Sequence, residues 1–552
     1  MPKTTTRNSE RRRCRPWSLL GAVLLASCTG LIGAVDADGG SIEGAGGDGG
    51  AIAYTGPVAL PAGVRRLTQA EVVTSVATLL GVPADPIGIA LGTDTRQTGF
   101  TRNADQRVGS VQADALWHAV EGLAGTAVTQ RLTQLAPCTT SGGSDTCAKA
   151  FIHDFGPKAF RRALTAAEEA ALFTVYTVGK TQDGTYAAGV GLVITAVLQS
   201  PSFLYLTELG DAVVDGGTTL TGEEAATQLA YLLTGGPASA ALLTQGRQGA
   251  LTTADGRETA ARALLATATG KAQVERLVLE WIGADAVDSS SKDGVLYPEW
   301  PGMRPDVLAE SKWIIDSVLF QGDGKLSSLL LTDTTFMTPA LASYYNDMSG
   351  SGQVPFPAPR RGLLLAGAFL SANSQPASTA PVKRGAAVRK KLLCQVLPVP
   401  TNLGVINVPP PDPTKTTRER FSAHSATPVC ATCHSQLDPI GFSMESFDPV
   451  GRYRTTENGK PVDVSGELIN AEDASGSFAN GVELMQRLAN AEIVKKCLPR
   501  QVFRFAAARS GGGEEETFSH FVAGRPSAVD AKVVELLVDW VKSDAFMTRR
   551  VE

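Results

Sequence analysis

Two cysteines and a histidine in the C-terminal third of the chain are spaced closely enough to hold one group together. Residues 430–434 read Cys-Ala-Thr-Cys-His. In a C-x-x-C-H motif the two thiols add to the vinyl groups of a haem, and the adjacent imidazole becomes an axial ligand of the iron. With 8 Cys and 5 His among 552 residues, an accidental match is expected only on the order of 10⁻³ times. The motif therefore predicts covalent haem c at Cys430 and Cys433, with His434 as the proximal ligand.

Two other chemistries use the same residue types. A zinc half-site needs further ligands, and His424 is the one additional histidine near the motif. A pair of thiols can instead act in redox exchange, as in cytosolic C-x-x-C proteins. The compartment of the protein decides between these interpretations.

The N-terminus has the features of an export signal. Four arginines between positions 11 and 15 precede the apolar run 17–25, which is too short to span a membrane. The run ends in Leu-Ala-Ser-Cys at 25–28, which resembles a bacterial lipobox and predicts lipidation of Cys28. The alternative is an ordinary signal cleaved after Ala34 or Ala37. Both predict an extracytoplasmic protein. The first adds a lipid anchor in the cell envelope (periplasm or outer membrane) as its only membrane contact.

Export permits disulfides among the remaining cysteines. Cys138 and Cys147 flank a Gly- and Ser-rich loop that a bridge would close. If Cys430 and Cys433 carry haem, Cys394 and Cys497 are left over and are predicted to form a second bridge.

The elements that position these residues are expected to be helices. Three Leu-Thr pairs are followed by a glutamate that completes a capping box, at Thr68/Glu71, Thr165/Glu168 and Thr221/Glu224. The apolar stretch 187–203 is interrupted by Gly and Pro, which favours a buried core helix over a membrane span. No sustained strand-like alternation occurs, so we predict a mainly α, multi-domain protein. A net charge of −5 gives no electrostatic case for nucleic acid.

Changes in composition predict six segments. They are a signal peptide (1–27), a Gly-rich flexible tether (28–62), an N-terminal helical domain (63–205), a middle helical domain (206–350), a cytochrome-c-like haem-motif domain (351–454) and a C-terminal helical domain (455–552).

A longer pattern surrounds the motif. It comprises Pro381-Val382-Lys383-Arg384-Gly385, the C-x-x-C-H run, Asp438-Pro439-Ile440-Gly441-Phe442, Glu445, Phe447-Asp448, Gly451 and Arg454. Weaker matches extend the pattern to Arg66-Leu67-Thr68, Phe155-Gly156, residues 229–233, Cys497, Arg500-Gln501 and Arg509. The pattern resembles the planctomycete-type cytochrome c family, secreted haem-motif proteins built from domains of unknown function. The resemblance implies a secreted haem protein and supplies no substrate.

The other face of the haem iron has several candidate ligands. Met444 follows the motif closely, Met485 lies farther downstream, His424 precedes it, and an open position is the fourth alternative. A methionine or histidine ligand favours electron transfer, whereas an open position permits peroxide or oxygen chemistry.

Polar residues after the motif have two interpretations. Arg452 and Arg454 could bind the haem propionates, or could form ordinary salt bridges with Glu445 or Asp448. Asp438-Pro439 and Gly441 are predicted to form the turn that follows the haem helix.

Three functions follow from these residues. The first is electron transfer through one haem to an unknown redox partner protein. The second is a haem-dependent oxidoreductase of the peroxidase or dehydrogenase type. The third is a surface binding or scaffold lipoprotein without haem, in which Cys430 and Cys433 form a disulfide. Hydrolase, nucleotide-binding and H-E-x-x-H motifs do not occur in the sequence.

Overall fold

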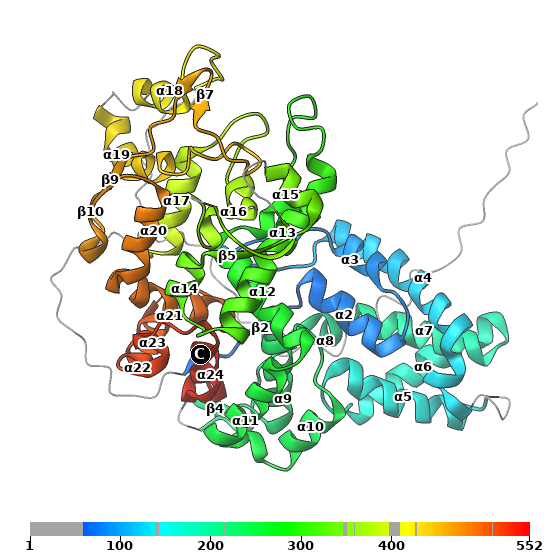
Figure 1. Ribbon diagram of the computed structural model, residues 1–552. Coiled ribbons are helices and arrows are strands. Elements are labelled where there is room, and N and C mark those ends of the chain that lie inside the picture. Colours follow the sequence, from blue (N-terminus) through cyan, green and yellow to red (C-terminus); the bar gives the residue numbers. More distant parts are fainter. Residues whose placement is uncertain are drawn as a thin grey trace, which may run out of the picture.

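The computed structural model describes residues 59–551 apart from 139–142, 215, 346–349, 358, 397–408, 425–427 and 511. Helices make up 62% of the structure and strands are few and short, which confirms the predicted mainly α fold. Figure 1 shows the N-terminal helices, blue to cyan, as a group beside the remaining chain. The predicted signal segment, Cys28 and most of the predicted tether lie outside the described residues.

The N-terminal group of helices has its own hydrophobic core, formed by residues between Leu67 and Leu206 together with Tyr231. Its helices are α2 (Gln69–Leu80), α3 (Asp85–Leu91), α4 (Ser110–Leu135), α5 (Asp145–Phe160), α6 (Ala166–Asp183), α7 (Tyr186–Gln199) and α8 (Pro201–Leu204). The apolar stretch 187–203, predicted as one core helix, forms α7 and the short α8, which begins at Pro201. Val190, Val193 and Ile194 of α7 are completely buried or nearly so. Among the helices of the described ranges, none is both long and apolar enough for a membrane crossing.

The rest of the chain forms a second, larger core. Its helices are α9 (Gly222–Thr234), α10 (Ala240–Arg247), α11 (Ala254–Leu265), α12 (Ala268–Ile282), α13 (Trp300–Asp316), α14 (Leu326–Leu331), α15 (Pro339–Tyr345), α16 (Gly367–Ala372), α17 (Pro381–Lys391), α18 (Thr417–His424), α19 (Pro428–Phe442), α20 (Gly481–Asn490), α21 (Glu492–Ala506), α22 (Gly512–Val522), α23 (Pro526–Val529), α24 (Val533–Lys542) and α25 (Asp544–Met547). The ranges 206–350, 351–454 and 455–552 all contribute to this one core, for example through Leu229, Phe369 and Phe503.

All three capping boxes predicted from the sequence form. Thr68, Thr165 and Thr221 each accept a hydrogen bond from the backbone of the glutamate three residues later, and each glutamate side chain accepts one from the capping residue's own N–H. They start α2, α6 and α9. Because these bonds join residues only three positions apart, the local sequence is sufficient to specify them.

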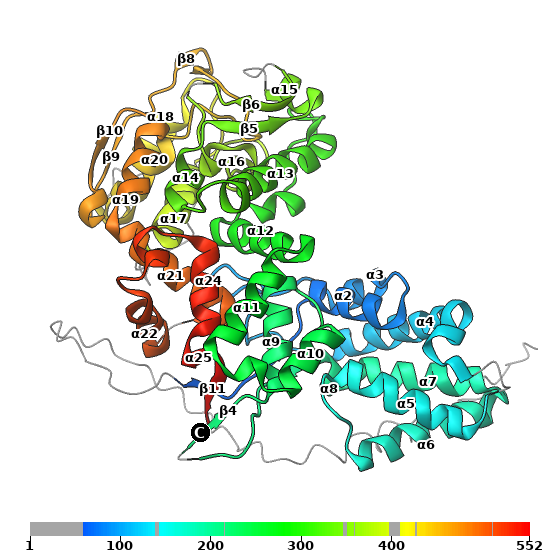
Figure 2. The ribbon, with the colours of Figure 1, turned by 60° about the horizontal axis from the view of Figure 1, so that its bottom comes forward.

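Short strands tie the two ends of the described chain together. Strand β1 (Leu60–Pro61) pairs in parallel with β11 (Thr548–Arg550), which pairs antiparallel with β4 (Gly217–Thr219). Figure 2 shows β4 and β11 side by side near the C-terminus. Beside this sheet, β2 (Val64–Arg66) pairs antiparallel with β3 (Tyr205–Thr207). The other pairs are β5 (Thr334–Met337) with β6 (Gly352–Pro355), β7 (Thr456–Glu457) with β8 (Lys460–Pro461), and β9 (Gly466–Leu468) with β10 (Gly476–Phe478).

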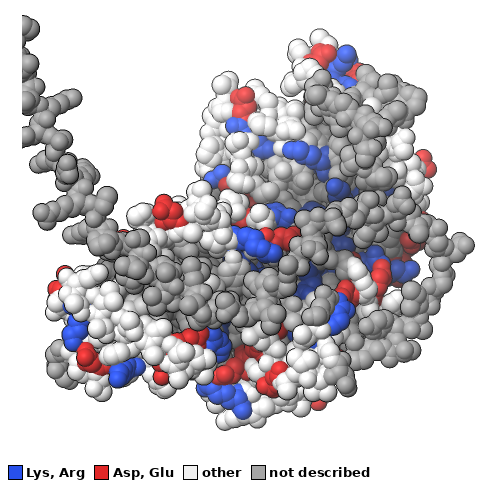
Figure 3. Space-filling view, turned by 180° about the vertical axis from the view of Figure 1, so that it is seen from behind, with Lys and Arg blue, Asp and Glu red and all other residues white. Residues whose placement is uncertain are grey.

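Both predicted disulfides are present. The Cα atoms of Cys138 and Cys147 are 5.8 Å apart, and those of Cys394 and Cys497 are 5.4 Å apart. The second bridge joins the segment after α17 to α21, more than a hundred residues away. On the face shown in Figure 3, basic and acidic side chains of the described residues are interspersed.

Candidate functional site

Helix α19 carries the whole C-x-x-C-H motif. Cys430, Cys433 and His434 occupy positions i, i+3 and i+4, so they lie on one face across a single turn. All three side chains are half-buried, and neither cysteine is in a disulfide. The alternative in which Cys430 and Cys433 form a disulfide with each other is therefore not what the structure contains. Helix α18 precedes the motif, but the side chain of its last residue, His424, lies outside what the structure describes.

The imidazole of His434 is held by a carboxylate one turn later on the same helix. Nδ1 of His434 lies 2.9 and 3.0 Å from the two carboxylate oxygens of Asp438. An ionised carboxylate can only accept, so Nδ1 donates the hydrogen bond. This bond raises the pKa of His434, and partial burial opposes the effect.

The donor set fits a c-type haem in its chemistry. Metal-ligating histidines commonly donate one ring N–H to a carboxylate, which fixes the tautomer and presents the other nitrogen to the metal. Two thiols outside disulfides beside such an imidazole are what covalent attachment needs. Among the described residues, no group of three or more His, Cys, Asp or Glu is arranged to hold a bare metal ion.

The prediction of a turn at Asp438-Pro439 and Gly441 was wrong, because these residues lie inside α19. The reason is tertiary packing between α17 and α19. A Cβ on Gly441 would overlap the backbone of Pro381 in α17, and a Cβ on Gly385 would overlap the carbonyl of Leu437 in α19. Gly441 therefore permits close approach of two helices and does not end one.

A buried ionic cluster anchors the segment that follows α19. The carboxylate of Glu445 accepts hydrogen bonds from Arg454 Nη2 at 2.8 Å and from the Thr379 hydroxyl at 2.7 Å. Arg384 of α17 lies 3.4 Å from the same carboxylate and donates to the carbonyl of Met444 at 2.9 Å. Because burial disfavours its charge, the pKa of Arg384 falls to about 10.

The two arginines proposed for the haem propionates are engaged in ion pairs. Arg454 pairs with Glu445 and Glu457, at 2.8 and 3.3 Å. Arg452 pairs with Asp448 and with Glu299, both at 2.8 Å. The salt-bridge alternative therefore describes both side chains in this structure, and binding of propionates would require these pairs to open.

Both candidate methionine ligands are core residues. Met444 and Met485 have no exposed side-chain area and belong to the larger hydrophobic core. Met444 would reach the iron only if the packing around it changed.

Sequence reasoning named Asp438, Gly385 and Arg384 as part of the longer pattern and missed their role in positioning the motif. Asp438 orients His434, while Gly385 and Arg384 connect α17 to α19 and to Glu445. The four-residue spacing of His434 and Asp438 was a usable signal, because such pairs are neighbours on a helix. The other two contacts join distant parts of the chain and left no local signal.

Comparison with protein-family models gives three matches. Residues 147–208 match PSD5, a protein of unknown function (DUF1595); residues 220–346 match PSD4 (DUF1592); and residues 360–457 match PSCyt3 (DUF1588). The third match spans α17, α19 and the C-x-x-C-H motif. No curated protein and no solved structure is similar enough to match. The matches show no haem-binding domain. The chain thus contains three domains of the kind found in planctomycete cytochrome c-type proteins.

Proposed function

We propose that the protein is an extracytoplasmic c-type haem protein that transfers electrons through a single haem attached to helix α19. The observation that carries the proposal is the arrangement on one helix face of two thiols and an imidazole bound by a carboxylate. When bound, haem supplies one-electron redox chemistry at a potential set by its ligands and surroundings.

The residues of α19 would have different roles in binding the haem. Cys430 and Cys433 would hold the haem covalently, and His434 would be a ligand of its iron. Asp438 keeps the imidazole ring in one orientation through its contacts at 2.9 and 3.0 Å. The close contact with α17 at Gly385 and Gly441 makes the helix a rigid support, which a precise site requires.

A single haem changes its oxidation state by one electron. Electron transfer therefore requires a redox partner protein that delivers or accepts that electron. The second candidate function, a haem-dependent oxidoreductase, is favoured by the complete burial of Met444 and Met485. Without a methionine sulfur opposite His434, the remaining arrangements are ligation by His424 or an open position for a small reactant.

The proposed location is the cell envelope, with lipidated Cys28 as the anchor. Labelling with a radioactive fatty acid tests this. The wild-type chain should incorporate label and the Cys28→Ala chain should not. Incorporation by both chains, or by neither, contradicts the anchor.

Expression with a cytochrome c maturation system tests the haem proposal. The wild-type chain should retain haem on a denaturing haem-stained gel, and the chain with Cys430→Ala and Cys433→Ala should not. As a matched control, Cys138→Ala with Cys147→Ala removes two cysteines of the distant disulfide and should leave haem attachment unchanged. Absence of stain from correctly folded wild-type protein would overturn the proposal.

Carbon monoxide then separates the two haem functions. A reduced, low-spin spectrum that carbon monoxide does not change supports electron transfer with a sixth protein ligand. A spectrum that shifts on addition of the gas supports the oxidoreductase, because the ligand needs an accessible coordination position.

A further inference from the structure

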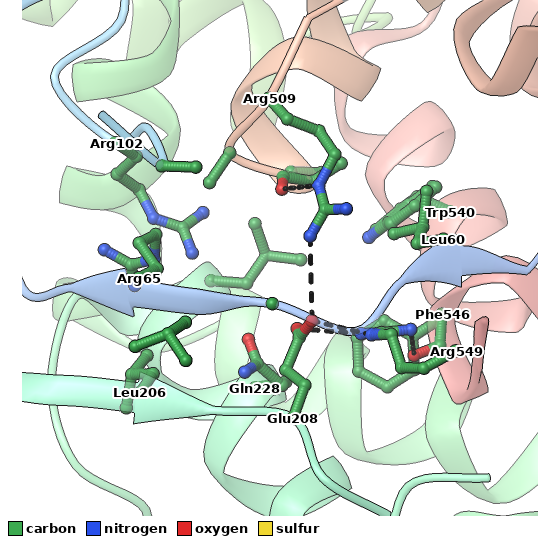
Figure 4. Close-up of a pocket in the computed structure, with 17 residues that line it drawn as sticks. Leu60, Arg65, Arg102, Leu206, Glu208, Gln228, Arg509, Trp540, Phe546 and Arg549 are labelled. Carbon is green, nitrogen blue, oxygen red and sulfur yellow. Dashed lines mark hydrogen bonds and ion pairs between the residues drawn. The ribbon is translucent and has the colours of Figure 1, made fainter. Parts of the chain in front are cut away.

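An arginine-lined pocket lies far from the haem motif, where the start and the end of the described chain meet. It is bordered by the β1–β2 segment, the residue after β3, the end of α21, and β11. Figure 4 shows the guanidinium groups of Arg65 and Arg102 on one side of the pocket and those of Arg509 and Arg549 on the other. Four segments that are distant in sequence therefore each bring polar groups to one space.

The pocket carries more positive than negative charge. Four arginines line it together with one carboxylate, Glu208, which Arg549 binds through two hydrogen bonds of 2.6 and 2.8 Å. Adding Glu71, which contacts Arg65 and Arg102, leaves four guanidinium groups against two carboxylates. The nearby Arg550 and Arg276 each have an acidic partner of their own, Glu514 and Glu280. An excess of two positive charges remains.

These charges are shielded from water, which makes the excess costly. The side chains of Arg102 and Arg549 are 1% and 3% exposed, and that of Arg509 is 22% exposed. Burial lowers the pKa of Arg509, and burial together with the charge of Arg65 lowers the pKa of Arg102 to about 9. Buried charges are normally compensated by an opposite charge.

Two polar groups that line the pocket make no hydrogen bond to any residue that the structure describes: Nη2 of Arg509 and the side-chain amide of Gln228. Nη2 of Arg509 lies 3.8 Å from Glu208, beyond hydrogen-bond distance, whereas Nη1 donates to the carbonyl of Pro61 at 3.0 Å. The side-chain amide of Gln228 lies beside Glu208 in Figure 4 and makes no hydrogen bond to any described residue. Both groups can donate to an oxyanion.

The dimensions restrict the ligand to a small one. The cavity has a volume of about 40 Å³, and one water molecule needs roughly 10–15 Å³ of such volume. A Cβ on Gly63 would lie 2.9 Å from Nη2 of Arg509 and 3.7 Å from Glu208, so the glycine keeps this space open.

We propose that this pocket binds a small oxyanion, of the size of phosphate or of a carboxylate group. The ligand would accept hydrogen bonds from Arg509 and Gln228 and would offset the excess charge. It would also connect α9, which carries Gln228, to the segment after α21, which carries Arg509.

Unfolding experiments on the full haem-loaded protein test the proposal, with inorganic phosphate and then acetate as probes at constant ionic strength against chloride. At a concentration about a hundredfold above its Kd, the bound anion should lower the unfolding equilibrium constant about a hundredfold. Arg509→Gln should weaken binding about tenfold or more, since a hydrogen bond to a charged group is lost. The exposed Arg247→Gln, whose arginine pairs with Glu223 on the surface, is the matched control and should bind as the wild type does.

Gly63→Ala provides a second variant that leaves every charge in place. It should weaken binding because the added methyl group occupies the cavity, and haem attachment should be unchanged in all variants. Phosphate and sulfate also stabilise proteins by general exclusion from the surface. Equal stabilisation of the wild type, Arg509→Gln and Gly63→Ala would therefore overturn the proposal, as would no stabilisation by either probe.

Discussion

Two buried clusters of this protein each consist of two arginines and one glutamate, and the pKa of the glutamate is shifted in opposite directions in the two. The junction triad, Arg65, Glu71 and Arg102, lies between the N-terminal helices and the rest of the chain. The motif triad, Arg384, Glu445 and Arg454, lies behind helix α19. Both carboxylates are at most 1% exposed. The pKa of Glu71 is lowered to about 2, whereas the pKa of Glu445 is raised.

The difference comes from the charges around each carboxylate and the hydrogen bonds that it receives, which oppose the effect of burial to different extents. Burial opposes ionisation of Glu71, but Arg65 donates to both its oxygens at 2.6 and 3.1 Å, Arg102 donates at 3.2 Å, and the N–H of Thr68 donates at 2.8 Å. Together these donors outweigh the cost of burial.

The ionised carboxylate of Glu445 is stabilised less than that of Glu71. Burial raises its pKa, and the arginines offset this only in part, because Arg384 is 3.4 Å away and donates its closer bonds to the carbonyl of Met444 and the hydroxyl of Ser374. The negative charge of Glu457 adds to the effect. The positions of the surrounding charges and hydrogen-bond donors, and not the composition of the triad alone, therefore decide which protonation state the fold stabilises.

The largest effect is expected from Glu71→Gln. The variant leaves Arg65 and Arg102 buried with their main counter-charge removed, which should lower the free energy of unfolding by about 3–5 kcal/mol. Urea unfolding at neutral pH measures the loss. Glu169→Gln is the matched control, because Glu169 is 40% exposed and pairs with His153 on the surface, where a pair contributes about 1 kcal/mol or less. A similar small loss for both variants would contradict the role of the junction triad.

The pH dependence of the two triads should have opposite signs. The folded pKa of Glu71 lies below its ordinary value of 4.5, so its contribution is complete above about pH 5 and is lost as the pH falls towards 2. A shift from 4.5 to about 2 corresponds to about 3 kcal/mol of stability. The folded pKa of Glu445 lies above 4.5, so its contribution is greatest in acid and decreases as the pH rises through that folded pKa.

Unfolding free energies of the wild type and the two glutamine variants, measured from about pH 2 to pH 8, check these signs. The difference between wild type and Glu71→Gln should shrink in acid. The free energy of unfolding of the wild type should decrease relative to that of Glu445→Gln as the pH rises. If the difference in unfolding free energy from the wild type changes in the same direction with pH for both variants, the proposed contrast between the two triads is wrong.

The smallest of the three effects is expected from Glu445→Gln at neutral pH. A neutral amide resembles the protonation state that burial already favours, so the loss should be about 1–3 kcal/mol, typical of a buried hydrogen-bonding group left without its full set of partners. Haem attachment, read on the stained gel, should persist. A loss larger than that of Glu71→Gln would reverse the proposed order.

Much of the fold could be predicted from the sequence, because the relevant interactions are local. The capping boxes at Thr68, Thr165 and Thr221 form as expected. The Cys138–Cys147 disulfide was predicted from the short loop that it closes, and the Cys394–Cys497 disulfide from the two cysteines then left over. The core position of α7 followed from its composition and its interruption by Gly and Pro.

The prediction at Gly441 failed because a glycine is equally suitable for a turn and for a close helix contact. Only the position of Pro381 on another helix distinguishes the two. For Arg452 and Arg454 the sequence left two alternatives, and the carboxylates Glu445 and Asp448 were already named as partners in one of them. Glu299, the further partner of Arg452, lies 153 residues away and could not be inferred.

The sequence by itself therefore determined the helical character of the chain, the starts of three helices and the grouping of Cys430, Cys433 and His434 on one turn. These features depend on bonds and spacings within about four residues. Only the tertiary structure decided the burial of Met444, the pairing of the arginines and the pocket at Arg509. The physical reason is that burial and charge pairing depend on which distant segments share a boundary, and no local spacing encodes that.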